Sequence, residues 1–119
     1  MEQDVELAIT SRQVQEVTVL DLRGRLVFGE EVTLLRECVR LLLAQKRKKI
    51  LLNFQQVAFV DSSGAGTIVA CYASVRAAGG GLKFARANRH FREMLECTRL
   101  LGLLPLFESE EEALASFDS

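Results

Sequence analysis

One short stretch of small and hydroxyl-bearing residues decides the fold: Asp61-Ser62-Ser63-Gly64-Ala65-Gly66-Thr67. It follows an apolar run, Ile50–Phe54, which is too short for a helix and suits a strand buried on both faces of a parallel sheet. It precedes a segment in which apolar residues recur at three- and four-residue steps, as in a helix. The stretch is therefore predicted to be a tight turn between a buried strand and a helix over about 63–78.

The residues before this turn predict two strands and a helix. Residues 5–10 and 17–23 are expected to be strands, joined by a polar turn around 11–13. Paired apolar residues at helical spacing predict a helix over about 30–45. After the strand at Ile50–Phe54 we expect a loop that carries Val57, Phe59 and Val60 to Asp61.

The residues after the turn predict two further strands and two further helices. Gly79–Gly81 is expected to end the helix, because glycine accepts the left-handed conformation of a C-cap. Leu82–Ala85 alternates like a strand, and Asn88 is placed to cap the next helix. A short edge strand is expected around 104–107, followed by a capping box, Ser109–Glu112, and a terminal helix.

The resulting order is ββαβαβαβα, which predicts an α/β fold in a single domain over residues 1–119. Strands that alternate with helices favour a mostly parallel sheet with right-handed crossovers. The initial hairpin supplies an antiparallel edge, so the sheet is mixed. A chain of 119 residues with 49% hydrophobic and 26% charged residues suits one globular domain.

The charge pattern gives no indication of nucleic-acid binding. The formal net charge is -1, whereas a nucleic-acid binder normally carries a basic face. One basic run, Lys46–Lys49, and one acidic group, Glu108 with Glu110–Glu112, are the exceptions to an even distribution. Both are expected either to complement helix dipoles at helix ends or to form a partner-facing patch.

The cysteines and the apolar segments indicate a cytoplasmic protein. Cys38, Cys71 and Cys97 are odd in number, form no CxxC pair and are expected to be buried free thiols. We expect no metal site, because His90 is the sole histidine. No apolar stretch approaches the roughly 18 residues that span a bilayer, and the first residues lack a signal-peptide core.

The turn itself carries the chemistry that the sequence offers. Asp61, Ser62 or Ser63 can cap the helix, and Gly64 and Gly66 remove side chains so that another chain can approach the backbone. A helix start also tolerates an anion, so a phosphate on Ser63 would fit the fold while adding about -1.5 to -2 charge to the surface. The alternative is that these residues only make a capped turn.

An enzymatic role for the serines finds little support. A nucleophile elbow reads Gly-x-Ser-x-Gly, whereas Asp61 and Ala65 occupy the outer positions around Ser63. A catalytic triad would have to recruit His90, and no Gly-Lys-Ser/Thr phosphate loop follows the glycines. We therefore expect no catalytic residues.

The chain resembles the STAS domain, the family of bacterial anti-sigma-factor antagonists and of the cytoplasmic tails of sulfate transporters. The most specific match is Val60–Gly66, which is similar to the family's aspartate–serine–serine–glycine–leucine–glycine turn. Gly24-Arg25-Leu26 and the segment from Phe91 to Leu114 also match, so the resemblance covers nearly the whole chain.

The resemblance implies partner switching. The unphosphorylated domain binds an anti-sigma factor that is also a serine kinase, phosphorylation of Ser63 releases it, and a PP2C-type phosphatase resets the switch. ATP and magnesium belong to the kinase, so no cofactor is expected on this chain. The residues expected to contact the partner are Asp61, Ser62, Ser63, Gly64, Ala65, Gly66 and Phe28.

Two departures from the family pattern leave alternatives open. Val27-Phe28 stands where the family often has an aspartate, and Phe28 is expected either to contact a partner or to pack on the core. Ala65 replaces the usual leucine, which is expected to flatten the first helical turn. The alternative functions are a constitutive scaffold, such as a subunit of a lipid-transport ATPase or of a sensory complex, and an enzyme or small-ligand binder.

Overall fold

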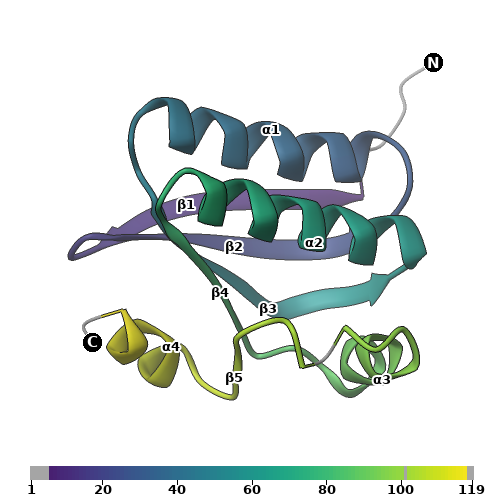
Figure 1. Ribbon diagram of the computed structural model, residues 1–119. Coiled ribbons are helices and arrows are strands. Elements are labelled where there is room, and N and C mark those ends of the chain that lie inside the picture. The colour runs from purple at the N-terminus through teal and green to yellow at the C-terminus, as the bar shows by residue number, and fades with distance from the viewer. Residues whose placement is uncertain (1–5, 101, 118–119) are drawn as a thin grey trace.

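A five-stranded mixed sheet forms the centre of the fold, which is described by a computed structural model over residues 6–100 and 102–117 (Figure 1). The strands lie in the order β1-β2-β3-β4-β5. They are β1 (Leu7–Val14), β2 (Val17–Leu26), β3 (Lys49–Val60), β4 (Gly81–Ala85) and β5 (Leu106–Phe107). Only the β1–β2 pair is antiparallel, so the predicted α/β order with an antiparallel edge hairpin is confirmed.

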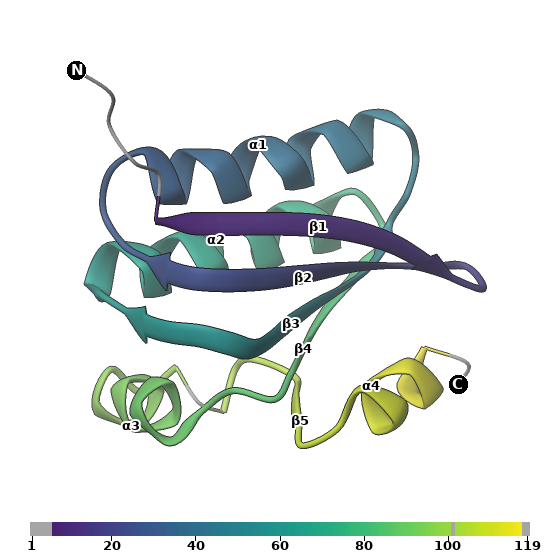
Figure 2. The ribbon, with the colours of Figure 1, turned by 180° about the vertical axis from the view of Figure 1, so that it is seen from behind.

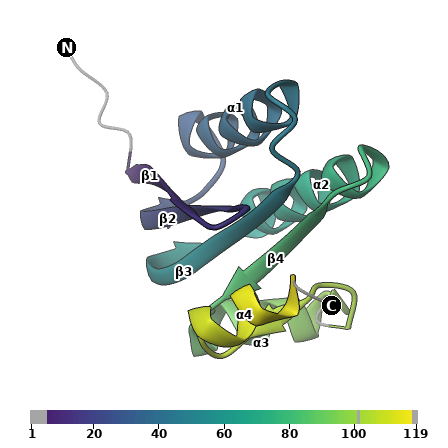
Figure 3. The ribbon, with the colours of Figure 1, turned by 90° about the vertical axis from the view of Figure 1, so that its left-hand side faces the viewer.

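Helices α1 (Glu30–Ala44) and α2 (Ser62–Ala77) lie side by side over one face of the sheet (Figures 1 and 3). Helix α3 (Arg89–Cys97) joins the same core, where the Phe91 and Phe54 ring centroids are 4.9 Å apart. Viewed from behind, β1 and β2 lie in front of α1 and α2 (Figure 2).

Helix α4 (Glu110–Ser116) packs against the opposite face of the sheet. Its buried Ala113 belongs to a second apolar cluster with Val19 and Leu51, whose side chains point away from α1 and α2. Two sheet faces with apolar residues explain why β3 reads as a near-continuous hydrophobic run at its start.

The first hairpin is longer than the sequence predicts. Residues 11–13 belong to β1, and Val14 pairs with Val17 across a two-residue turn that begins at Gln15, whose φ is 55°. The predicted polar turn was wrong because β1 is an edge strand with its outer face in solvent, so polar residues are compatible with pairing. Arg12 uses this position to bond Asp21 (Nε to Oδ2, 2.6 Å).

Strand β3 also runs further than predicted, to Val60. The residues expected to form a loop continue the pairing with β2 after two register shifts, which place Leu26 opposite Val60. The first irregularity lies where Gln55 and Gln56 interrupt the apolar run, and the second lies between Val57 and Phe59. Such bulges break the sequence alternation without ending the strand. As a result, β2 and β3 end side by side at one edge of the sheet.

The acidic group lies at a helix end as predicted, whereas the basic run does not. Ser109 accepts a hydrogen bond from the Glu112 backbone N–H (3.1 Å), and the acidic residues of the capping box form the first turn of α4 as predicted. The basic run lies after the end of α1 and extends into the first residue of β3, so it contributes nothing to the last helical turn.

The cysteines are less uniformly buried than predicted. Cys71 is buried and Cys38 is partly buried, but Cys97 is exposed. The expectation for Cys97 was wrong because α3 buries only one stripe, represented by Phe91 and Leu95. Burial raises the pKa of the Cys71 thiol to about 11, which keeps it protonated and unreactive at neutral pH.

The described residues include neither a membrane-spanning helix nor a metal-binding cluster. None of the helices is both long and apolar enough to cross a bilayer. Within the same residues, His, Cys, Asp and Glu side chains nowhere gather in a group of three that could hold a metal ion.

Candidate functional site

Asp61 holds together the two loops that leave the shared edge of β2 and β3. Its backbone N–H donates to the Leu26 carbonyl (3.2 Å), in continuation of the sheet. One carboxylate oxygen accepts from the Gly64 N–H (2.8 Å) and caps α2, and the other accepts from the Phe28 N–H (2.9 Å). Asp61 is therefore the cap among the three predicted candidates, and it also fixes the loop before α1.

The two serine hydroxyls are left without a capping role. Ser62 is exposed, and Ser63 is half-buried at the first turn of α2. Within the described part of the chain, neither hydroxyl has a hydrogen-bond partner. A modification of Ser63 would therefore remove no hydrogen bond from the fold.

The two glycines have different roles. A Cβ on Gly64 would lie 2.3 Å from the Leu26 carbonyl oxygen and 2.9 Å from a Val60 methyl, so glycine is required for packing against the chain's own strands. Gly64 is buried, which contradicts the expectation that it opens the backbone to another chain. Gly66 is exposed and its Cβ position meets no atom within 4 Å, so it does leave an open surface.

Ala65 lies in the core rather than on the partner-facing surface. Its side chain is buried in the main apolar cluster, between the sheet and α2. The expectation that alanine flattens the outer surface of this turn is corrected accordingly, because the change from leucine is felt inside the domain. Of the predicted contact residues, Gly64 and Ala65 therefore shape the site from within.

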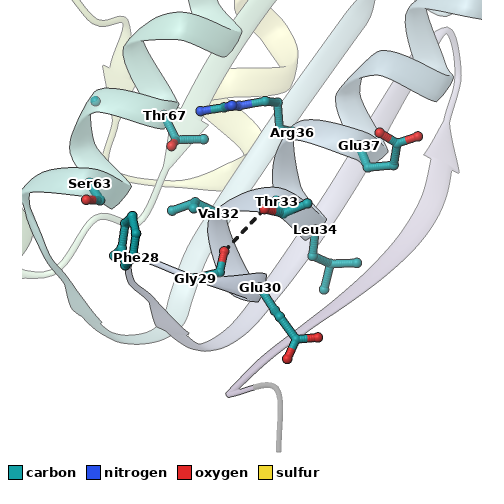
Figure 4. A pocket seen from close by; sticks show the side chains of 11 residues that line it. Phe28, Gly29, Glu30, Val32, Thr33, Leu34, Arg36, Glu37, Ser63 and Thr67 are labelled. Carbon is teal, nitrogen blue, oxygen red and sulfur yellow. Dashed lines mark hydrogen bonds between the residues drawn. The ribbon is translucent and has the colours of Figure 1, made fainter. Parts of the chain in front are cut away.

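A groove of about 940 Å³ opens between the starts of α1 and α2 (Figure 4). Phe28 and the first two turns of α1 form one wall, and Ser63, Gly66 and Thr67 form the other. Phe28 is 79% exposed, so of the two alternatives that the sequence left open, packing on the core is excluded. The groove thus brings together an exposed aromatic ring and the half-buried Ser63.

The charges around the groove are unevenly paired. Glu37 on α1 forms an ion pair with Arg40 of the same helix, on its exposed surface. Arg36 extends from α1 across the groove toward Thr67 (Figure 4). Among the described residues Arg36 has neither an ion-pair partner nor a hydrogen-bond partner.

His90 lies outside the groove. It is exposed on α3, and its ring stacks on Phe59 of β3 with centroids 5.0 Å apart. Arg25 lies over the same Phe59 ring, 5.4 Å from its centroid. His90 is thus engaged by a neighbouring aromatic ring, and the groove, as the described residues line it, contains no imidazole that could serve Ser63 as a base.

The sequence predicted most of the residues at the start of α2, but it did not place Arg36 or Thr67 among the expected contact residues. Arg36 reads as an ordinary polar residue beside the apolar stripe of α1, and its direction depends on how α1 and α2 pack. Thr67 is buried and lines the groove one turn after Ser63. The helical spacing of Ser63 and Thr67 was the one available signal, because residues four apart share a helix face.

The chain belongs to the STAS domain family, whose model matches residues 8–113. Among curated proteins, it is 28% identical over 69 residues to an anti-sigma F factor antagonist of Paenibacillus polymyxa. That match covers 58% of this chain and 59% of the relative, so the chain aligns with somewhat more than half the length of that protein.

Solved structures of low identity share the fold. An anti-sigma factor antagonist from Mycobacterium paratuberculosis superposes with a TM-score of 0.81 at 17% identity, covering 95% of each chain. The Bacillus antagonist SpoIIAA in its unphosphorylated form gives 0.76 at 24% identity, covering 90% of this chain and 93% of that one. Its phosphorylated form gives 0.71 at 24% identity, with 92% and 98% covered.

Proposed function

We propose that this protein is an anti-sigma factor antagonist that works in the cytoplasm as a phosphorylation-dependent binding protein, not as an enzyme. In its unmodified form it binds a serine-kinase anti-sigma factor through the groove wall at Ser63 and the exposed ring of Phe28. The observation that carries the proposal is a half-buried serine on the rim of a groove, beside an exposed aromatic side chain. Among the described residues, the hydroxyl of this serine makes no hydrogen bond.

Phosphorylation of Ser63 ends the complex in this mechanism. The kinase transfers the γ-phosphoryl group of its ATP to the Ser63 oxygen, so the new P–O bond replaces the bond to ADP and the hydroxyl proton is released. A PP2C-type phosphatase restores the hydroxyl by hydrolysis. A phosphate forced against a surface shaped for a hydroxyl costs several kcal/mol, or about a hundredfold or more in affinity.

Phe28 is the apolar anchor of the proposed interface. An aromatic side chain exposed to this degree has no role in the domain's own packing, and aromatic residues are enriched among the side chains that contribute most to binding. Because the Phe28 N–H is held by Asp61, its backbone is fixed at the mouth of the groove. The ring is thus presented next to Ser63 before a partner arrives.

The test is affinity capture from the native cell lysate, with mass spectrometry as the readout. The baits are the wild type, Ser63→Ala, Ser63→Glu and Phe28→Ala. Ser74→Glu is the matched control, because it places the same charge on an exposed residue of the same helix. We expect a serine-kinase-like protein with the wild type, Ser63→Ala and the control, and a loss with Ser63→Glu and Phe28→Ala.

The outcome also separates the two functions that the family allows. If all baits recover the same protein, Ser63 is only a turn residue, and the partner-switching mechanism is wrong. Recovery of a transport ATPase or of a sensory assembly by every bait would identify a constitutive scaffold instead.

A further inference from the structure

Arg36 stands out because it is a cation held over the groove without a counter-ion. The carboxylate next to it in sequence, Glu37, is turned to Arg40 on the exposed surface of α1. Arg36 instead crosses the groove toward Thr67, away from Glu37 (Figure 4). Within the described residues no acidic side chain comes to meet it, so its charge is available to an anion that arrives later.

The position of Arg36 is defined by one stripe of α2. Ser63, Thr67 and Cys71 recur every four residues and therefore share the helix face that looks toward α1. Arg36 lines the groove together with Ser63 and Thr67, and it also borders the smaller cavity that contains Cys71. Its positive charge opposes the rise in the pKa of the Cys71 thiol that burial causes, which places it beside the same stripe.

Thr67, toward which the Arg36 side chain extends, lies one helical turn, roughly 5.4 Å along the helix axis, from Ser63 (Figure 4). A phosphate on Ser63 would carry its oxygens outward from the serine into the same groove. An arginine side chain is long enough to cover this distance by rotamer changes alone, and its planar fork suits phosphate oxygens. The two groups can therefore meet without movement of either helix.

We propose that Arg36 is the intramolecular counter-ion of phosphorylated Ser63, so that the switch closes an ion pair across the groove between α1 and α2. The inference rests on the proposed function for the identity of the modified residue. In the phosphorylated state the pair spans the groove between its two walls, so a partner segment finds the groove bridged as well as charged. Arg36 is a positioning residue for the phosphate and has no part in the phosphoryl transfer itself.

The experiment measures the phosphate directly and needs no partner. Phosphoserine is installed at position 63 during translation, and the second pKa of the phosphate, ordinarily about 6, is followed by phosphorus NMR. The protein is compared with Arg36→Gln, Arg36→Lys and the control Arg40→Gln, which removes a cation from the same helix. We expect the phosphate pKa to lie about half a unit to one unit higher in Arg36→Gln than in wild type.

Several results bear on the inference. Arg36→Lys is expected to retain part of the shift, and about 1 M salt is expected to reduce it, since that concentration shortens the screening length to about 3 Å. An unchanged phosphate pKa in Arg36→Gln would overturn the inference, as would an equal shift in Arg40→Gln. If the phosphate pKa shifts clearly in Arg36→Gln but phosphorylation of Ser63 does not change partner binding, the proposed function is refuted while the ion pair is supported.

Discussion

Replacing Asp61 by alanine is expected to destabilise the domain by about 2–3 kcal/mol, because one carboxylate makes two bonds of different kinds. The bond to the Gly64 N–H (2.8 Å) is a helix cap, and loss of such a cap costs about 1 kcal/mol. The bond to the Phe28 N–H (2.9 Å) joins a separate loop to a charged acceptor, and such a bond contributes about 1.5–3 kcal/mol. Asp61 is partly exposed, so the lower part of that range applies.

Urea denaturation of four proteins would test this addition. Asp61→Asn keeps an oxygen for the Gly64 N–H but presents an amide to the Phe28 N–H, so only the second bond is lost and the cost is expected at about 1–2 kcal/mol. The matched control is Ser109→Ala, which removes the exposed cap bond from the Glu112 N–H (3.1 Å) at α4 and the longer bond that the hydroxyl donates to the Glu112 carboxylate (3.3 Å). Both bonds are exposed, so the cost is expected to be about 1 kcal/mol or less.

Hydrogen exchange gives the same test at the level of one amide. The Phe28 amide proton is expected to exchange faster in both Asp61 variants and to be unchanged in Ser109→Ala. If Asp61→Ala costs no more than Ser109→Ala and leaves the Phe28 amide protected, the carboxylate does not join the two loops. The account of how Phe28 is held at the groove would then be wrong.

Two further predictions concern the glycines and the acid stability. Gly64→Ala is expected to lower the free energy of unfolding by about 3 kcal/mol, since its Cβ would meet the Leu26 carbonyl oxygen at 2.3 Å. Gly66→Ala, whose Cβ would meet no atom within 4 Å, is expected to stabilise α2 by up to about 1 kcal/mol. Equal urea midpoints for the two variants would contradict this. Hydrogen bonds from Arg12 lower the pKa of Asp21, so Asp21 adds stability above its unfolded pKa of about 3.9 that is lost as pH falls through the lower folded pKa. The stability of Asp21→Asn should therefore fall less steeply below about pH 4, and parallel acid curves would rule this out.

The features that the sequence predicted well are those that depend on local bonds. The caps at Asp61, Asn88 and Ser109 each accept from an N–H three residues further along the chain, so residue type and spacing are sufficient to locate them. Helix α2 ends at Ala77, and Gly79, whose φ is 86°, follows its C-cap for the same kind of reason. The alternation of strands and helices, and with it the topology, follows from these local boundaries.

The features that the sequence did not predict depend on neighbours that are distant in the chain. The end of β3 is set by pairing with β2, which a run of residues with two glutamines does not reveal. Gly64 looks like an opening for a partner until the Leu26 carbonyl is placed against it. The directions of Phe28 and Arg36 likewise follow from the packing of α1 beside α2, and neither residue type decides them.

At the start of α2, the residue that caps the helix is not the residue that we propose to be phosphorylated. If a serine hydroxyl capped the helix, its phosphorylation would remove a bond that the fold uses, and the modified domain would be less stable. Because Asp61 caps the helix and fixes the loop before α1, a phosphate on Ser63 leaves every bond of that junction in place. The phosphate would then act at the surface, where it would add negative charge to the groove that a partner would enter and make that groove narrower. Such a site can alternate between two binding states with no loss of folding stability.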